Sequence, residues 1–387
     1  MKASFKKLDV MSWGGFMMFA VSSVITPICL PEISKTLATN FSESGGMETA
    51  RTLLVVLVLL LAGVGARRWG KKPFITSGQY CLALGLFLIS VSPDYPLLIL
   101  SLMITGIGGG FTEALINPLV VDLHPVDSGK YLNITNAFYS IGVMAGALVF
   151  GELLTAGYSW RWIFRIAAFG ALVVGIGFNG SRFPSAEAGD TRATNHVILQ
   201  ILIIPGFWLF AAAIFLGAGV ESAFTFWSRT YVETYLKDVP RAGAIAVVVF
   251  AAMMAVGRLL AAKLSQRMDM TAIMLYSAIL GVVVSGMIPF IHTLPIFYLL
   301  LAFTGLATAC FWPSILAEAA GSLRVDATIL FAMLASVGIA GFGFAPWIMG
   351  IIGDYTNLRK GFFILPGLFM LLIVLLATER RIMRTTR

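Results

Sequence analysis

PLLILSLMITGIGGGFTEALINPLVV, at residues 96–121, is an apolar stretch that contains a single charged side chain, Glu113. A helix needs about 20 mostly apolar residues to cross the hydrocarbon core of a bilayer. A membrane-spanning strand would instead alternate apolar and polar residues over about ten positions. The stretch therefore predicts one transmembrane helix with a carboxyl group inside it.

Runs of the same kind recur along the whole chain. The twelve runs cover residues 9–31, 50–66, 74–92, 96–121, 132–156, 162–181, 198–228, 242–263, 270–291, 295–319, 327–352 and 361–378. Short polar turns join most of them. The sequence thus predicts an all-α membrane protein with twelve transmembrane helices.

The composition agrees with lipid as the surrounding solvent. The chain has 387 residues, of which 58% are hydrophobic and 12% are charged, whereas a soluble domain carries about 25% charged residues. The three cysteines, Cys29, Cys81 and Cys310, lie in apolar runs without metal or redox spacing. No nucleotide-binding loop precedes a helix in the required way. We therefore expect no metal, no cofactor and no ATP-driven step.

The net charge of +8 is explained by membrane topology. If the N-terminus lies in the cytoplasm, 17 of the 27 Lys and Arg residues fall on the cytoplasmic side, 9 fall on the other side, and Arg258 lies within a helix. Cytoplasmic loops carry such an excess of basic residues. We expect both termini in the cytoplasm, no nucleic-acid partner, and a monomer in a bacterial inner (cell) membrane.

The two halves of the chain resemble a repeat. Related residue groups recur at offsets of 194 to 196 positions. The matched positions are Gly63 and Gly257, Asn117-Pro118 and Trp312-Pro313, and Ser140 and Ser336. Parallel repeats are the architecture of carriers with a site between two halves. The predicted organisation is a bundle at 1–181, a cytoplasmic linker at 182–197 and a second, pseudo-symmetric six-helix bundle at 198–387.

Glu113 is the sharpest candidate for function. A charge near the bilayer centre costs about 2.5–3.5 kcal/mol even on the lenient insertion scales. Burial disfavours the charged form of a carboxyl group, so such a group can load and release a proton. Asn117 lies four residues on and shares its helix face. The alternative is that Glu113 only fixes packing against a neighbouring helix.

Two further sets of side chains could line a binding site. Asn133, Asn136 and Tyr139 form a polar stripe with three-residue spacing, suited to a polyol or to a contact between helices. A set of aromatic residues in the second half could stack on a sugar ring or serve in packing. These residues are Phe224, Trp227, Phe311 and Trp312.

The loop at residues 63–73, GVGARRWGKKP, resembles the loop motif of the major facilitator superfamily, roughly G-x-L-A-D-R-x-G-R-K. Arg67 stands where the family usually has Asp. The resemblance implies gating roles for Arg67 and Arg68, an inner-gate pairing of Asp122 with Arg68, and an interface ion-pair role for Arg258. It also implies the major facilitator fold.

The stretch at residues 106–118, GIGGGFTEALINP, with Leu132-Asn133, Phe138, Gly142 and Gly146 after it, resembles the fucose–galactose–glucose:proton symporter branch of that superfamily. The resemblance implies that Glu113 handles the proton and the sugar, beside Asn117. The fucose symporter has an acidic residue within its first helix. Here the residues in the middle of that helix are Ser22 and Ser23.

We therefore expect a secondary active transporter, not an enzyme. It would move a small polar solute, with sugars as the first candidates, by alternating access. We expect proton-coupled symport, with sodium as the other possible coupling ion. One alternative is a proton-coupled exporter of drugs or amphiphilic compounds, which the Phe- and Met-rich helices allow. The other is a membrane receptor or scaffold that transports nothing.

Overall fold

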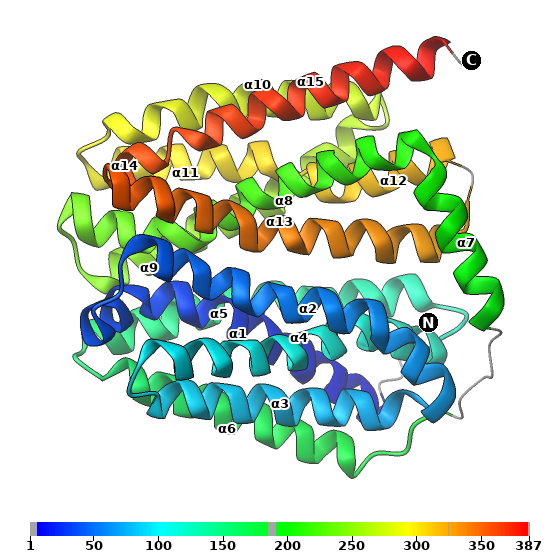
Figure 1. The fold of residues 1–387 in the computed structure, drawn as a ribbon, viewed down its shortest axis with the longest axis horizontal. Helices are drawn as coiled ribbons and strands as arrows, with labels where there is room; N and C mark the ends of the chain where they lie inside the picture. Colours follow the sequence, from blue (N-terminus) through cyan, green and yellow to red (C-terminus); the bar gives the residue numbers. More distant parts are fainter. Residues whose placement is uncertain (1–5, 185–190, 324, 386–387) are drawn as a thin grey trace. The chain divides into compact units, whose positions relative to one another are not determined.

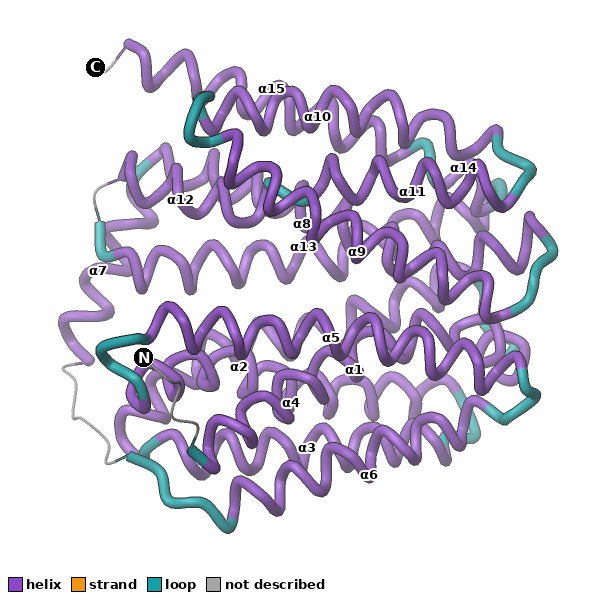
Figure 2. Tube along the Cα trace, turned by 180° about the vertical axis from the view of Figure 1, so that it is seen from behind, coloured by secondary structure: helices purple, strands orange, loops and turns teal. Residues whose placement is uncertain are grey.

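The computed structural model describes residues 6–184, 191–323 and 325–385, which form helices joined by turns and loops (Figures 1 and 2). Twelve helical stretches within these ranges are long and apolar enough to cross a membrane. The prediction of an all-helical membrane protein with twelve spans is confirmed. Helices suit this solvent because they satisfy their own backbone polar groups, which the bilayer core cannot do.

Helix ends are set by side chains that the sequence places in the turns. The Asp94 side chain accepts a hydrogen bond from the Leu97 backbone N–H at 3.0 Å and caps the helix that follows. Asp326 does the same for the Ile329 N–H at 2.9 Å. Caps of this type satisfy backbone donors that the first helical turn leaves without an internal partner.

The chain divides into two compact units. The first unit comprises Met1–Thr39 and Ala50–Gly189, and the second comprises Asn40–Thr49 and Asp190–Arg387. The helices of the first unit are α1 (Lys7–Leu37), most of α2 (Phe41–Trp69), α3 (Lys71–Val91), α4 (Tyr95–Leu123), α5 (Ser128–Thr155) and α6 (Trp160–Asn179). Within it, α3 packs against both α4 and α6, and α1 packs against α5 (Figure 1).

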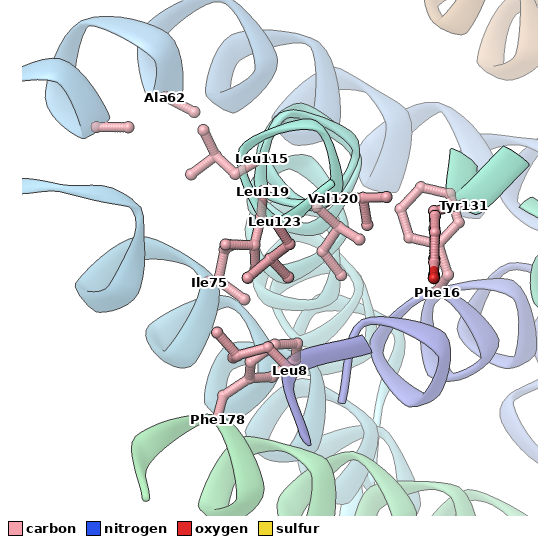
Figure 3. Close-up of a cluster of buried hydrophobic side chains, with 12 residues drawn as sticks. Leu8, Phe16, Ala62, Ile75, Leu115, Leu119, Val120, Leu123, Tyr131 and Phe178 are labelled. Atoms are coloured by element: carbon pink, nitrogen blue, oxygen red, sulfur yellow. The ribbon is translucent and has the colours of Figure 1, made fainter. Parts of the chain in front are cut away.

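An apolar cluster in the core of the first unit contains buried residues of all six helices, α1 to α6 (Figure 3). Ile75 of α3, Ile116 of α4 and Phe178 of α6 have no exposed surface. The other buried members are Leu8, Phe16, Ala62, Ala66, Leu115, Leu119, Val120, Leu123 and Tyr131. The cluster fixes the rotation of α4 about its axis, and with it the direction of every polar side chain on that helix.

Helices α3 and α4 approach closely because glycine faces glycine. A Cβ atom on Gly108 would lie 2.5 Å from the Gly78 carbonyl oxygen and 2.7 Å from the Leu82 backbone nitrogen. Small residues at such contacts let backbones pack tightly, and dispersion then replaces the hydrophobic effect as the force between helices in lipid.

The second unit contains the remaining helices. They are α7 (Thr191–Ile203), α8 (Pro205–Tyr231), the π-helix η1 (Val232–Leu236), α9 (Pro240–Leu264), α10 (Met270–Met287), the 3₁₀ turn η2 (Ile288–Phe290), α11 (Leu294–Thr308), α12 (Phe311–Leu323), α13 (Ala327–Tyr355), α14 (Leu358–Gly361) and α15 (Ile364–Thr385). Helix α13 packs along α8, and α10 packs along α15 (Figure 1).

Two features of this unit differ from the runs read in the sequence. Helix α7 begins inside the predicted linker at 182–197, and a new helix starts at Pro205, which suits the first turn because proline lacks an N–H. The span at Leu294–Leu323 is interrupted between α11 and α12. Apolar composition alone shows neither break.

The residues at the start of α2 that belong to the second unit are held by α13. The Asp354 carboxylate accepts hydrogen bonds from the backbone N–H groups of Phe41 and Ser42, each at 2.8 Å. Gly350 leaves room for Phe41, whose ring packs edge-on against Trp227. An acidic group at a helix N-terminus also complements the helix dipole.

The contact between α3 and α4 gives a test of this packing. We expect Gly108→Ala to lower the free energy of unfolding by about 1–3 kcal/mol, because the added methyl group would overlap backbone atoms that cannot move aside. Gly63→Ala is the matched control, since no atom lies within 4 Å of a Cβ at that position. Thermal unfolding of both variants in detergent measures the effect, and equal midpoints would contradict the packing described.

Candidate functional site

Glu113 lies inside the membrane-spanning part of α4. The helix runs from Tyr95 to Leu123, and the Glu113 side chain is half-buried. No described side chain forms an ion pair with it. A charged group within a span is energetically costly, so Glu113 is a candidate for function.

A buried amide supports the same segment of α4. Gln79 of α3 has no exposed surface, and its Nε2 donates a hydrogen bond to Thr112 Oγ1 at 2.9 Å. Thr112 in turn donates to the Gly108 carbonyl at 2.9 Å. The sequence reasoning missed Gln79, although it is a lone amide in an otherwise apolar run. The Gln79 side chain holds Thr112, the residue directly before Glu113, in place.

The structure brings Asn117 and Asn136 together. Asn136 Nδ2 of α5 lies 3.3 Å from Asn117 Oδ1 of α4 and 2.8 Å from the Leu132 carbonyl oxygen, to both of which it donates. Asn136 is exposed and Asn117 is half-buried. Asn133 is also exposed on α5, but it does not join this contact. The two bonded amides keep polar atoms accessible for a ligand.

Tyr139 extends the polar surface of α5 towards α1. Its hydroxyl lies 3.4 Å from Ser23 Oγ, which itself donates to the Ala20 carbonyl at 2.7 Å. The Tyr139 ring packs against Phe16 and Phe19. A half-buried phenol that touches a serine on a neighbouring helix can donate or accept a hydrogen bond, which suits a hydroxylated ligand.

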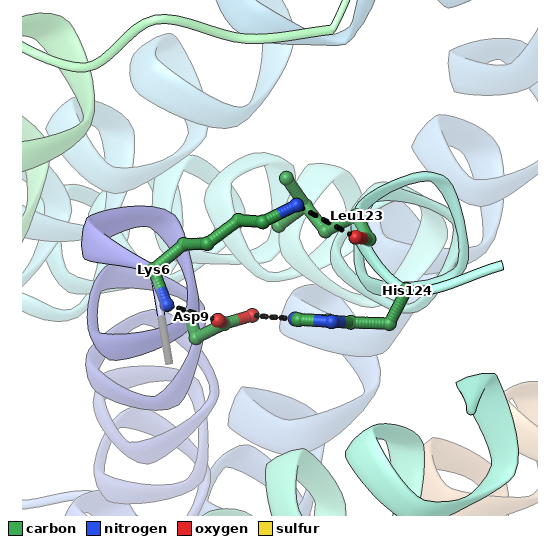
Figure 4. A network of polar contacts seen from close by, with 4 residues as sticks. All are labelled: Lys6, Asp9, Leu123 and His124. Carbon is green, nitrogen blue, oxygen red and sulfur yellow. Dashed lines mark hydrogen bonds and ion pairs between the residues drawn. The ribbon is translucent and has the colours of Figure 1, made fainter. Parts of the chain in front are cut away.

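A second cluster of polar contacts, formed by Lys6, Asp9 and His124, lies at the C-terminal end of α4. His124 Nε2 is 2.8 Å from Asp9 Oδ1, and the side chains are 9% and 2% exposed (Figure 4). The Lys6 backbone N–H donates to Asp9 Oδ2 at 2.6 Å, and the Lys6 ammonium donates to the Leu123 carbonyl at 2.9 Å. The sequence signals that could have found this group are an acid in the first turn of the first helix and a histidine directly after the fourth.

The pairing of Asp122 with Arg68, expected at the inner gate when the cavity opens outward, is not present in this structure. Asp122 pairs with Lys71, whose ammonium also donates to the Pro118 carbonyl at 3.2 Å. Lys71 is in the first turn of α3 and reaches along α4, whereas the Arg68 guanidinium stacks over Trp69 at 4.9 Å. The side chain of Arg67 lies outside the described part of the structure.

Three of the four aromatic residues expected to stack on a sugar are core residues of the second unit. Phe224, Trp227 and Phe311 are at most 1% exposed. Trp227 Nε1 donates to the Pro346 carbonyl at 3.0 Å, which ties α8 to α13. Only Trp312 is half-buried, with its ring edge-on to Phe342. The stacking hypothesis therefore depends on Trp312.

Charged residues of the second unit interact on α8 and on the elements beside it. The fully buried Arg229 pairs with Glu233 at 3.2 Å, four residues on in the π-helix. Glu221 is half-buried and interacts electrostatically with Arg258. Arg258 is exposed on α9, where its guanidinium lies 3.9 Å from Met254 Sδ.

Among the described residues, no group of three or more His, Cys, Asp and Glu side chains could hold a metal ion. Cys29, Cys81 and Cys310 are free thiols. In the first unit, the candidate residues described above are amide, hydroxyl and carboxyl groups on α1, α4 and α5.

Comparison with known proteins identifies relatives of this chain. The Major Facilitator Superfamily model matches residues 11–294, which is more than half of the chain. The membrane protein MosC of Rhizobium meliloti is 22% identical over 86% of this chain and 80% of its own length. The L-fucose-proton symporter of Escherichia coli is 29% identical over 36% of this chain and 32% of its own length.

Other relatives are matched over shorter segments. The MFS transporter L2 of Phoma is 26% identical over 39% of this chain, which spans 25% of the length of that protein. The MFS-type efflux transporter phmH of Phaeosphaeria nodorum is 30% identical over 31% of this chain and 21% of its own length. These matches cover only part of both chains.

Solved structures share the fold over almost the entire chain. The nucleoside transporter NupG superposes with a TM-score of 0.80 and 14% identity, covering 96% of this chain and 98% of the other. A D-xylose-proton symporter superposes with a TM-score of 0.77 and 13% identity, covering 96% of each chain. With a matching family model over most of its length, this chain is an integral membrane transporter, not an enzyme, and belongs to the major facilitator superfamily.

Proposed function

We propose that this transporter is a proton-coupled symporter that imports a small polar solute, with sugars as the first candidates, by alternating access. The observation that carries the proposal is Glu113, a half-buried carboxyl group within a span and without an ion-pair partner among the described side chains. Protonation removes its charge and would favour one conformation over the other. Sodium is the alternative coupling ion.

The surroundings of Glu113 support a polar substrate. Asn117 and Asn136 offer amide groups one helical turn away, and Tyr139 and Ser23 offer hydroxyl groups. Amides and hydroxyls both donate and accept hydrogen bonds, as a sugar does. Trp312 is the remaining candidate for stacking on the sugar ring. The relatedness to an L-fucose-proton symporter supports the same class of substrate.

The proposal includes a topology. We place both termini in the cytoplasm of a bacterial cell and the protein in the inner membrane as a monomer, because the cytoplasmic ends then carry the excess of Lys and Arg. The Lys71–Asp122 pair, with Arg67, Arg68 and Arg258, would act in gating at the cytoplasmic side. The proposed halves are residues 1–181 and 198–387, joined by a linker at 182–197.

Export of drugs or amphiphilic compounds is the second candidate. Its specific support is the relatedness to phmH, whose name describes an efflux transporter. The polar amide pair beside Glu113 favours the symporter, because a site for apolar compounds would gain nothing from Asn117 and Asn136.

The first test replaces the proposed proton carrier. In proteoliposomes with an imposed pH gradient, we expect Glu113→Gln to reduce accumulation of radiolabelled L-fucose, D-galactose or D-glucose at least about tenfold, because the amide cannot load a proton. Wild-type uptake should increase as the outside pH falls below the inside pH. Glu152→Gln is the matched control, since Glu152 is exposed on α5.

Two results would contradict this proposal. Uptake driven only by a sodium gradient would show that the proton is not the coupling ion. Efflux of a fluorescent cationic dye, combined with no uptake of any of the three sugars, would favour the exporter.

The second test addresses the amide pair. We expect Asn136→Ala to raise the KM of sugar uptake roughly fivefold, because loss of one hydrogen bond to substrate costs about 1 kcal/mol. The thermal midpoint should change little, since Asn136 is exposed. Asn179→Ala, at the exposed end of α6, is the control. An unchanged KM would remove Asn136 from the binding site.

A further inference from the structure

The polar residues of α4 form a line that runs from Glu113 to the end of the helix. Asn117 follows Glu113 by four residues, and His124 follows Asn117 by seven, so the three positions lie on one face of α4. Eleven residues separate Glu113 from His124, which corresponds to about 16 Å along the helix axis. The line therefore connects the centre of the span to its end.

Helix α5 faces this line with partners at both levels. Asn136 bonds Asn117 at the upper level. At the lower level, Tyr131 stacks on His124 with ring centroids 3.4 Å apart and an angle of 1° between the planes. Val120, which is 1% exposed, fills the position between the two levels. Along α4, the apolar Val120 thus separates the Asn117–Asn136 contact from the His124–Tyr131 contact.

The Asp9–His124 pair at the end of α4 can accept and release a proton. Asp9 Oδ1 lies 2.8 Å from His124 Nε2, and both side chains are at least nine-tenths buried. A neutral imidazole that donates through Nε2 leaves its Nδ1 free to accept a proton, and the adjacent carboxylate stabilises the imidazolium that results.

The charges around the pair come from four elements. At the start of α1, the Lys6 ammonium donates to the Leu123 carbonyl and the Lys7 ammonium donates to the Gly180 carbonyl. Lys71 of α3 pairs with Asp122 of α4. On α5, the Tyr131 ring stacks on His124, and the Lys130 ammonium lies over the Tyr131 ring. Asp9 is thus the carboxylate in direct contact with His124.

We infer that the buried Asp9–His124 pair is the terminal station through which the Glu113 proton leaves the carrier. The inference rests on the proposed proton-coupled function. The O–H bond of the Glu113 carboxyl breaks, leaving a carboxylate. The proton passes Val120 through water that enters when α4 and α5 separate, and an N–H bond forms at His124 Nδ1. The imidazolium then returns the proton to water at the end of α4.

A purely structural role makes a different forecast. If the pair only fastens the start of α1 to the end of α4, its loss would lower stability and every transport mode together. A terminal proton station is needed only for net proton-coupled movement. It is not needed for exchange of labelled for unlabelled sugar at equal pH, because the carrier can then stay protonated through the cycle.

The test uses His124→Gln in the full chain. The glutamine amide can still donate to Asp9, but it cannot take a proton. Proteoliposomes containing an internal pH dye and L-fucose, D-galactose or D-glucose report net proton-coupled uptake between about pH 5.5 and about pH 8 and, separately, equilibrium exchange. Asp9→Asn is the second variant, and Lys7→Gln, at the same end of the unit but exposed, is the control.

We expect both variants to lose net proton-coupled uptake at least about tenfold and to flatten its pH profile, while exchange stays within about twofold of wild type. Equal loss of both modes, or a fall in the thermal midpoint that Lys7→Gln does not share, would overturn the inference in favour of a structural role. Wild-type net uptake in both variants would overturn it as well. If the wild-type protein moves no protons with any of the sugars, the proposed function fails first, and this inference falls with it.

Discussion

The constraint on which this molecule depends is that the bilayer core offers no water to polar groups. Backbone groups meet it by forming helices, and buried polar side chains meet it by bonding one another, as Gln79 does with Thr112. Glu113 lies in the same environment without an ion-pair partner among the described side chains. An unpaired carboxylate within a span has a high free energy, and protonation removes that cost, so Glu113 is a candidate for moving a proton.

The packing of the first unit explains why its polar residues gather. The glycine contact between α3 and α4 draws the two helices together, and the apolar cluster around Ile75, Ile116 and Phe178 fixes their rotation (Figure 3). Asn117 of α4 then meets Asn136 of α5, whose amide donates a hydrogen bond to it at 3.3 Å. The site is thus a consequence of how tightly two glycine-bearing helices can approach.

The two units contribute unequally to chemistry. The first carries amides, hydroxyls and a carboxyl group on half-buried or exposed surfaces of α1, α4 and α5. The second places most of its aromatic candidates in its core, where Trp227 fastens α8 to α13 through the Pro346 carbonyl. This difference fits the proposal that polar recognition and proton handling belong to the first unit.

The sequence by itself determined the twelve spans and the family, and it singled out Glu113 as a candidate, because span length, a loop motif and a charge among apolar residues are local properties of the chain. It also predicted Asn117 and Asn136, whose spacing along α4 and α5 is local too. Only the tertiary structure decided that Asp9 pairs with His124, that Asp122 pairs with Lys71 instead of Arg68, and that Phe224 is core. Those outcomes depend on the rotation and contact of helices distant in the chain, and apolar patterns do not encode rotation when a helix is hydrophobic on every face.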